Sequence, residues 1–173
     1  MILEKEYFSA PATELARDLI GKILCRRCGD EVIKARITET ECYFGEEDTA
    51  CHAHKGKTER TKPMYEQGGI TYVYLCYGIH ALLNIVSGER DHPEAVLIRG
   101  VEGAIGPGRA TKRLRITLSD NALPLCEESG IWIEDDGAVR PKIKRLARVG
   151  IDYASKRDRE RKWRFIALDK GRQ

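Results

Sequence analysis

The sequence has no long apolar run, which excludes proteins that cross a membrane with apolar helices. None of its segments approaches the about eighteen apolar residues that a membrane-spanning helix needs. The N-terminus, MILEKEYFSA, lacks the basic start and the apolar stretch of a secretory signal peptide. We therefore expect no membrane association. The expected location is the cytoplasm, at the nucleoid, in a prokaryote, or the nucleus in a eukaryote.

The sequence also lacks the paired C-x-x-C motifs that are typical of structural zinc sites. Six cysteines occur, and Cys25 and Cys28 form a C-x-x-C that no second C-x-x-C follows. The pair lies on a predicted hairpin, KILCRRCGDEV, in which Gly29-Asp30 makes the turn. In such a chain we expect free thiols rather than a disulfide framework. A zinc or redox role for the pair stays open as an alternative.

Internal repeats and low-complexity segments are absent, and the chain is long enough for one domain. Of its 173 residues, 42% are hydrophobic and 33% are charged, as in folded domains. The pattern predicts a helix after Ser9, several β-rich runs, and a helix opened by Gly106-Pro107-Gly108. We expect a single α+β domain over residues 1–173. It should contain a curved, mostly antiparallel sheet, short surrounding helices and a protruding β-hairpin.

The net charge of +3 is small, but it is unevenly distributed. Residues 1–98 carry 12 basic against 16 acidic side chains, whereas residues 99–173 carry 18 against 11. A basic half can follow a phosphate backbone. A solvated charged surface is the alternative.

Two glutamates interrupt the apolar face of the predicted strand in ARITETECYFGEED, residues 35–48. Side chains alternate along a strand, so Glu39 and Glu41 should share a face with Ala35 and Ile37. Burial raises the pKa of a carboxyl group, which suits a general base. Both glutamates are candidates for that role. A structural carboxylate bonded to backbone amides or to an arginine is the alternative for each.

Tyrosines gather in two places, and one has an unusual position. Tyr43 follows Glu41, and Tyr72, Tyr74 and Tyr77 lie in a predicted hairpin, ITYVYLCYGIHALLNIVSG. Most tyrosines pack in cores or interfaces. Tyr77 is expected at the exposed tip, where a bulky side chain can wedge between base pairs.

A cysteine and three histidines offer possible metal ligands. Cys51, His52 and His54 lie close in sequence, and His80 follows in the hairpin. Their spacing matches no familiar structural zinc site, although converging ligands would permit one. A histidine near a base can instead stack on it or form a hydrogen bond with it.

Together these motifs resemble a known enzyme family. The run from Glu39 to Gly45, ETECYFG, with Asp48 and His52, is similar to the E-T-E-A-Y-x-G-x-x-D-x-A-x-H signature of the alkyladenine (3-methyladenine) DNA glycosylases. Further blocks follow in the same order at residues 72–80, 84, 94–99, 106–108, 147–151 and 163–165. The resemblance covers nearly the whole chain.

This resemblance implies that the protein extrudes a damaged base from duplex DNA. In the family a hairpin tyrosine fills the gap left in the base stack, and Tyr77 matches it. The flipped purine lies among aromatic side chains, and Tyr43, Tyr74 and His52 match these. The expected partner is double-stranded DNA that contains damaged purines.

The resemblance also implies the chemistry. Glu41 matches the general base that activates water against the sugar carbon C1′, and Arg99 matches an arginine that positions the water and a phosphate. Glu39 is then structural support. No lysine matches a nucleophile, so we expect base release without strand cleavage, and neither a metal nor another cofactor.

The remaining expected contacts concern lesion choice and DNA. Asn84 matches an asparagine at the pocket floor that disfavours the 2-amino group of guanine, and Leu97 matches a residue on the minor-groove side. Arg109 and Lys112 are expected to contact phosphates. We expect a monomer, because one enzyme encloses one flipped nucleotide.

The chain departs from the family pattern at three positions. Cys42 replaces an alanine, Glu46 a common proline, and Thr61 an asparagine in the loop after His52. These departures concern the range of substrates more than the reaction. Two other classes stay open: a damaged-DNA-binding module without catalysis, and a zinc-dependent hydrolase.

Overall fold

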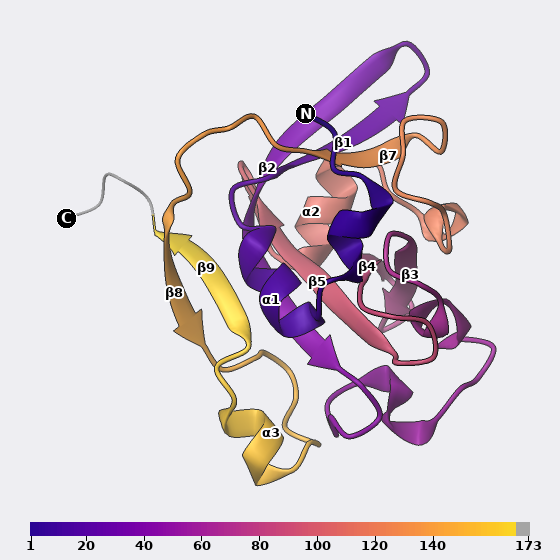
Figure 1. The fold of residues 1–173 in the computed structure, drawn as a ribbon, viewed down its shortest axis with the longest axis vertical. Coiled ribbons are helices and arrows are strands. Elements are labelled where there is room, and N and C mark those ends of the chain that lie inside the picture. The colour runs from indigo at the N-terminus through magenta and orange to yellow at the C-terminus, as the bar shows by residue number, and fades with distance from the viewer. Residues whose placement is uncertain (169–173) are drawn as a thin grey trace.

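The computed structural model describes residues 1–168, and its first hairpin joins β1 (Ile23–Cys28) to β2 (Glu31–Phe44). Cys28 faces Glu31 across a two-residue turn, which confirms the turn predicted at Gly29-Asp30. Gly29 has a φ of +62°, and glycine adopts this conformation without steric cost. The hairpin projects from one end of the molecule, and the C-terminal helix lies at the opposite end (Figure 1).

All strands pair antiparallel in a curled sheet, which confirms the predicted fold class. The main path runs β3-β4-β5-β2-β1-β7, with β6 beside β5 and with β9 joining β2 to β8. The long β2 pairs with β1 along its first part and with β5 and β9 along its second. The remaining strands are β3 (Thr71–Cys76), β4 (His80–Val86), β5 (Glu94–Val101), β6 (Ala104–Ile105), β7 (Ile131–Glu134), β8 (Lys142–Leu146) and β9 (Arg164–Leu168).

Short helices surround this sheet. They are α1 (Ala12–Asp18), α2 (Pro107–Arg113) and α3 (Lys156–Glu160), with 3-10 helices at Lys5–Ser9, His52–Lys55, Lys62–Tyr65 and Leu118–Asp120. Pro107 begins α2 after Gly106, as the sequence predicts. The helix predicted after Ser9 is α1, and Pro11 rather than Ser9 occupies its capping position. The Ser9 hydroxyl accepts a hydrogen bond from Gln67 instead.

At Glu39, the face of β2 that points into the hydrophobic core changes from the odd-numbered to the even-numbered residues. The register against β5 is irregular on both sides of this residue. Ile37 and Cys42 lie in the same hydrophobic core, although simple alternation would place them on opposite faces. The expectation that Glu41 shares the face of Ala35 and Ile37 is therefore wrong. Glu41 points away from the core that contains Cys42, because a local register irregularity re-aims the side chains that follow it.

The β3–β4 hairpin ends in a three-residue turn that exposes Tyr77. Cys76 pairs with His80, and Tyr77 and Gly78 have φ values of +51° and +66°. The Tyr77 side chain is 91% exposed, which agrees with the predicted tip position. A left-handed conformation is uncommon for a bulky residue and often marks a functional site.

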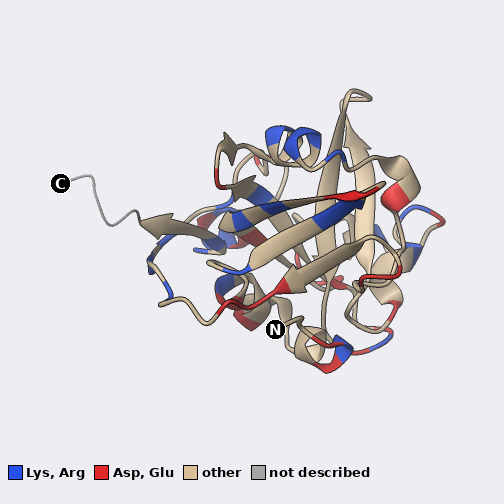
Figure 2. Ribbon diagram, turned by 90° about the horizontal axis from the view of Figure 1, so that it is seen from above, with Lys and Arg blue, Asp and Glu red and all other residues tan. Residues whose placement is uncertain are grey.

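Acidic and basic residues are both spread over the ribbon, except in α2 (Figure 2). The charged residues of α2 are all basic, whereas α1 and α3 contain both signs. No helix within residues 1–168 combines the length and the apolar character that crossing a membrane requires.

Candidate active site

A cleft of about 550 Å³ opens beside the β3–β4 hairpin. Strands β3, β4 and β5 supply its floor, and the segments around residues 43–60 and 149–153 supply its walls. The cleft brings together seven of the residues that the sequence singled out: Tyr43, His52, Tyr74, Tyr77, Asn84, Leu97 and Arg99.

Glu41 lies directly behind the wall of this cleft. Its side chain is fully buried, and three residues that line the cleft contact its carboxylate. The Val149 amide donates to Oε1 over 2.8 Å, and the Tyr43 hydroxyl donates to Oε2 over 2.8 Å. Arg99 Nε lies 3.4 Å from Oε1. A carboxylate has about four acceptor positions, so these three contacts leave one of them without a partner among the described residues.

Burial raises the pKa of Glu41 above the ordinary glutamate value, although its neighbours oppose this shift. The charge of Arg99 is the strongest opposing influence, followed by the hydrogen bonds from Val149 and Tyr43. A carboxylate with a raised pKa is a stronger base than an exposed one. The site therefore combines a fixed orientation with increased basicity, as general-base catalysis requires.

Glu39 serves as an anchor for two arginines. Its Oε1 accepts from Arg99 Nε and from Arg164 Nη1, each over 3.1 Å. Arg164 also donates to the Ala147 carbonyl. These contacts agree with the structural role expected for Glu39, because they fix the arginine that faces Glu41.

Aromatic rings form one wall of the cleft. The His52 and Tyr74 rings meet edge to face with centroids 4.5 Å apart, and Tyr72 lies 5.4 Å from Tyr74. The His52 and Tyr74 rings are therefore in direct contact with each other in this structure. Arg60 lies over the Tyr74 ring at 5.2 Å, as in a cation–π contact.

His52 is neutral at physiological pH. Burial lowers its pKa to about 4, and the nearby charge of Arg60 acts in the same direction. Its Nδ1 lies 3.0 Å from the Tyr72 hydroxyl. The ring therefore offers stacking and hydrogen bonding rather than charge.

Asn84 and Leu97 lie side by side at the cleft floor, on paired strands. Asn84 Nδ2 donates to the Tyr72 carbonyl over 3.1 Å, which fixes its amide. Leu97 is only 3% exposed. Leu97 therefore lines the cleft with little exposed surface, and its expected place on the minor-groove side stays a prediction.

Arg109 and Lys112 lie outside the cleft, exposed on α2. The helix packs closely against the turn end of the hairpin, since a Cβ atom at Gly108 would approach His80 to 3.2 Å. The two cations thus lie on the element next to the hairpin that carries Tyr77.

The candidate metal ligands have other partners. His54 Nδ1 lies 2.6 Å from the Glu46 carbonyl oxygen, and His52 contacts Tyr72. Within residues 1–168, no three His, Cys, Asp or Glu side chains form a group that could hold a metal ion. All six cysteines, including Cys25 and Cys28, are free thiols.

Several residues of the cleft could not be predicted from residue type. Val149 supplies a backbone amide to Glu41, and residue type alone carries no signal for such a contact. Tyr153 lines the cleft, and its hydroxyl donates to the Ala50 carbonyl over 2.8 Å. Arg60 also borders the cleft.

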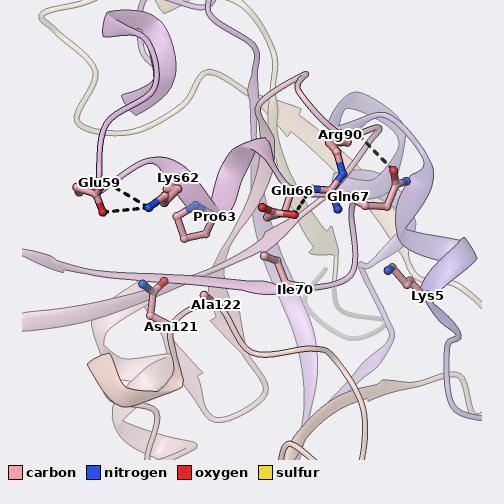
Figure 3. Close-up of a pocket in the computed structure, with 10 residues that line it drawn as sticks. All are labelled: Lys5, Glu59, Lys62, Pro63, Glu66, Gln67, Ile70, Arg90, Asn121 and Ala122. Atoms are coloured by element: carbon pink, nitrogen blue, oxygen red, sulfur yellow. Dashed lines mark hydrogen bonds and ion pairs between the residues drawn. The ribbon is translucent and has the colours of Figure 1, made fainter.

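A second cavity, of about 490 Å³, lies on another side of the 3-10 helix at Lys62–Tyr65 (Figure 3). Four of its five charged side chains form two pairs: Lys62 with Glu59 at 3.2 Å, and Arg90 with Glu66 at 2.6 Å. Exposed ion pairs of this kind contribute little. None of the residues singled out for chemistry lines this cavity, so the cleft beside the hairpin is the candidate active site.

Comparison with known protein families decides the classification. The family model for methylpurine-DNA glycosylase matches residues 6–104 and 102–171. The chain belongs to the methylpurine-DNA glycosylase family. This confirms the resemblance that the glutamate and tyrosine motifs indicate.

Relatives of this glycosylase occur in bacteria and archaea. A protein of Psychrobacter cryohalolentis is 42% identical over 183 residues, which cover 88% of this chain and 86% of the relative. A protein of Methanocella arvoryzae is 39% identical over 184 residues, which cover 95% and 91%. A protein of Bdellovibrio bacteriovorus is 42% identical over 171 residues, with 89% of each chain covered. All three carry the name of a 3-methyladenine DNA glycosylase.

Proposed function

We propose that the protein is a monofunctional DNA glycosylase of base excision repair. It flips an alkylated or deaminated purine out of duplex DNA and hydrolyses the N-glycosidic bond, leaving an abasic site. The observation that carries this proposal is the buried Glu41 carboxylate behind an aromatic cleft, held by Val149, Tyr43 and Arg99. Family membership and the names of the relatives support the same activity.

Base flipping explains the shape of the site. A base inside a duplex must leave the stack at a cost of roughly a few kcal/mol, which damage reduces. The exposed Tyr77 ring at the hairpin tip fills the gap, and the cleft next to it receives the base. Tyr43 and Tyr74 provide stacking surfaces, the neutral His52 lines the cleft beside Tyr74, and Asn84 at the floor rejects an additional amino group.

Glu41 then acts as the general base. It accepts a proton from a water molecule whose oxygen bonds to C1′, while the C1′–N bond breaks and its electron pair leaves with the purine. Arg99 stabilises the carboxylate and orients the water, and Glu39 holds Arg99. The product is the free base and a sugar with a hydroxyl at C1′.

The absence of lyase activity is part of this proposal. Strand cleavage by a bifunctional glycosylase needs an amine that forms a Schiff base with the sugar. The described residues that line the cleft include no lysine. The enzyme should therefore leave the strand intact.

The direct test uses the purified protein in chelator with duplexes that contain hypoxanthine or ethenoadenine, and with methylated genomic DNA. Free bases are identified chromatographically, and strands are examined before and after alkali. Free base with breaks only after alkali supports the proposal. Tight lesion binding without base release would instead favour a damaged-DNA-binding module. Activity that requires added zinc would favour the hydrolase alternative.

The Tyr43 hydroxyl is expected to contribute to the reaction separately from its ring. Tyr43→Phe keeps the stacking surface but removes the hydrogen bond to Glu41. A hydrogen bond to a charged group contributes roughly 1.5–3 kcal/mol, so the single-turnover rate should fall about tenfold. Lesion affinity should stay close to wild type. Tyr74→Phe, at another tyrosine of the cleft, is the control, and an equal loss in both variants would contradict this assignment.

Arg109 and Lys112 are expected to neutralise DNA phosphates. Replacing both by Gln should weaken binding to all duplexes. The slope of log K against log salt should become shallower by about 0.9 for each phosphate that the protein no longer neutralises. Lys142→Gln with Lys144→Gln changes the net charge equally on exposed β8 and is the control. Equal salt slopes in the two double variants would refute the α2 contact.

A further inference from the structure

A fully buried ion pair lies beneath the active site, and catalysis as described above makes no use of it. Arg148 and Asp48 have no exposed side-chain surface. Their contact is bidentate: Nη1 to Oδ2 at 2.6 Å and Nη2 to Oδ1 at 2.9 Å. Arg148 also donates to the carbonyl oxygens of Cys42 and Asp158. Apolar residues of similar volume often stabilise a fold equally well, so such a pair calls for another explanation.

The pair connects the segments that build the active site. Asp48 accepts hydrogen bonds from the amides of Phe44 and Ala50, at the end of β2 and in the loop that leads to His52. Val149, directly after Arg148, donates its amide to Glu41. One ion pair therefore sets the relative positions of the base-binding loop, the end of β2 and the amide that orients Glu41.

The guanidinium of Arg148 also supports an aromatic wall of the cleft. Its central carbon lies 5.0 Å from the Tyr43 ring and 5.0 Å from the Trp163 ring. A cation over an aromatic face is attracted to it, more strongly where water is excluded. Arg148 thus supports the ring against which a flipped base would stack, and whose hydroxyl bonds to Glu41.

We infer that Asp48 and Arg148 form a positioning unit that sets both the orientation of Glu41 and the place of the Tyr43 ring. This inference rests on the proposed glycosylase function. Neither residue touches the substrate. They act through the Val149 amide, through the Tyr43 ring and through the charge of the guanidinium near the Glu41 carboxylate.

The expected pH behaviour depends on every charged or titratable group that faces Glu41. Three groups lower the pKa of its carboxyl: Arg99 from β5, Tyr43 from β2, and Arg148 from the segment between β8 and α3. Tyr74 from β3 and Tyr153 from the segment before α3 also interact with its charge, and Glu39 on β2 shares the Arg99 Nε–H group with it. Arg148 favours the ionised carboxylate. Its removal should move the acid limb of the pH–rate profile upward, and removal of the Asp48 charge should move that limb downward.

The test compares Arg148→Met and Asp48→Asn with wild type by single-turnover release of hypoxanthine from a duplex at saturating enzyme. Misplaced catalytic groups cost up to about a hundredfold in rate, so both variants should lose on the order of tenfold to a hundredfold. The acid limb should move up by about one pH unit in Arg148→Met and down in Asp48→Asn, since a nearby charge shifts a pKa by about that much.

Arg26→Met is the matched control, because Arg26 forms a 2.7 Å pair with the buried Asp120 away from the cleft. It should lower Tm while leaving the saturating rate and the acid limb unchanged. Wild-type rates and an unmoved limb in folded Arg148→Met and Asp48→Asn would overturn the inference, since only stability would then depend on the pair.

If neither variant melts cooperatively, Trp163→Leu decides the question. It removes one wall around the guanidinium and leaves both charges in place. A rate lower by about tenfold without a limb shift supports the inference, and a wild-type rate overturns it. If wild type itself releases no base, the proposed function fails and this inference fails with it. An active wild type with unaffected variants overturns the inference alone.

Discussion

Glu41→Gln is expected to abolish base release while the protein still binds lesion-bearing DNA. Glutamine has nearly the same shape as glutamate and can keep contacts with the Val149 amide and the Tyr43 hydroxyl. It cannot accept a proton from water. General-base catalysis contributes roughly 10²–10⁴-fold, so the single-turnover rate should fall by about this factor.

The measurement is base release under single-turnover conditions, together with the affinity for a hypoxanthine duplex. Glu39→Gln is the informative control, because it makes the same chemical change two residues away on the same strand. Glu39→Gln weakens the contacts with Arg99 and Arg164 but keeps the Glu41 carboxylate as the proton acceptor. The single-turnover rate of Glu39→Gln should therefore fall much less. Activity of Glu41→Gln within tenfold of wild type, or a greater loss in Glu39→Gln, would reject Glu41 as the general base.

The pH dependence gives an independent check of this assignment. Burial raises the pKa of Glu41 above 4.5, and only the ionised carboxylate can act as a base. The rate should therefore fall as pH drops through a value above 4.5. His52 has a pKa of about 4 and stays neutral across this range, so replacing His52 by Gln should leave that limb in place. The limb should disappear in Glu41→Gln.

Local patterns were enough to predict the elements that carry the site. The turn at Gly29, the helix start at Pro107 and the exposed tip at Tyr77 each depend on a few adjacent residues, and the structure confirms them. The change of face at Glu39 was not predictable, because it depends on how β2 meets β5. Reading the glutamates as an anomaly in the strand was sound, although simple alternation assigned them the wrong face.

The contacts that orient Glu41 escaped prediction for a different reason. The amide of Val149 lies 108 residues from Glu41 in the chain, and Arg148 lies 100 residues from Asp48. Such pairings are set by the folded sheet and leave no periodic signal in sequence. The family resemblance marked Arg99, Asn84 and Leu97 without such a signal, and all three line the cleft.

Tyr77→Ala is expected to weaken base extrusion strongly while leaving the fold intact. The side chain is 91% exposed, so its removal costs little packing. In the proposed mechanism it fills the space that the flipped base leaves, and this wedge offsets the unstacking cost of roughly a few kcal/mol per step. The affinity for lesion duplex and the single-turnover rate should each fall about tenfold or more.

A change of substrate separates this role from a general weakening of DNA binding. When the lesion lies opposite an abasic site, no pair has to be broken and extrusion costs less. The defect of Tyr77→Ala should then shrink toward wild type. Ile79→Ala, at a 74% exposed position in the same turn, controls for the removal of apolar surface and should show no such dependence on the opposing residue. Equal defects on both substrates would show that Tyr77 contributes only contact area. A defect confined to the paired lesion would establish that Tyr77 at the hairpin tip promotes extrusion of the base, and that Glu41 acts only after extrusion.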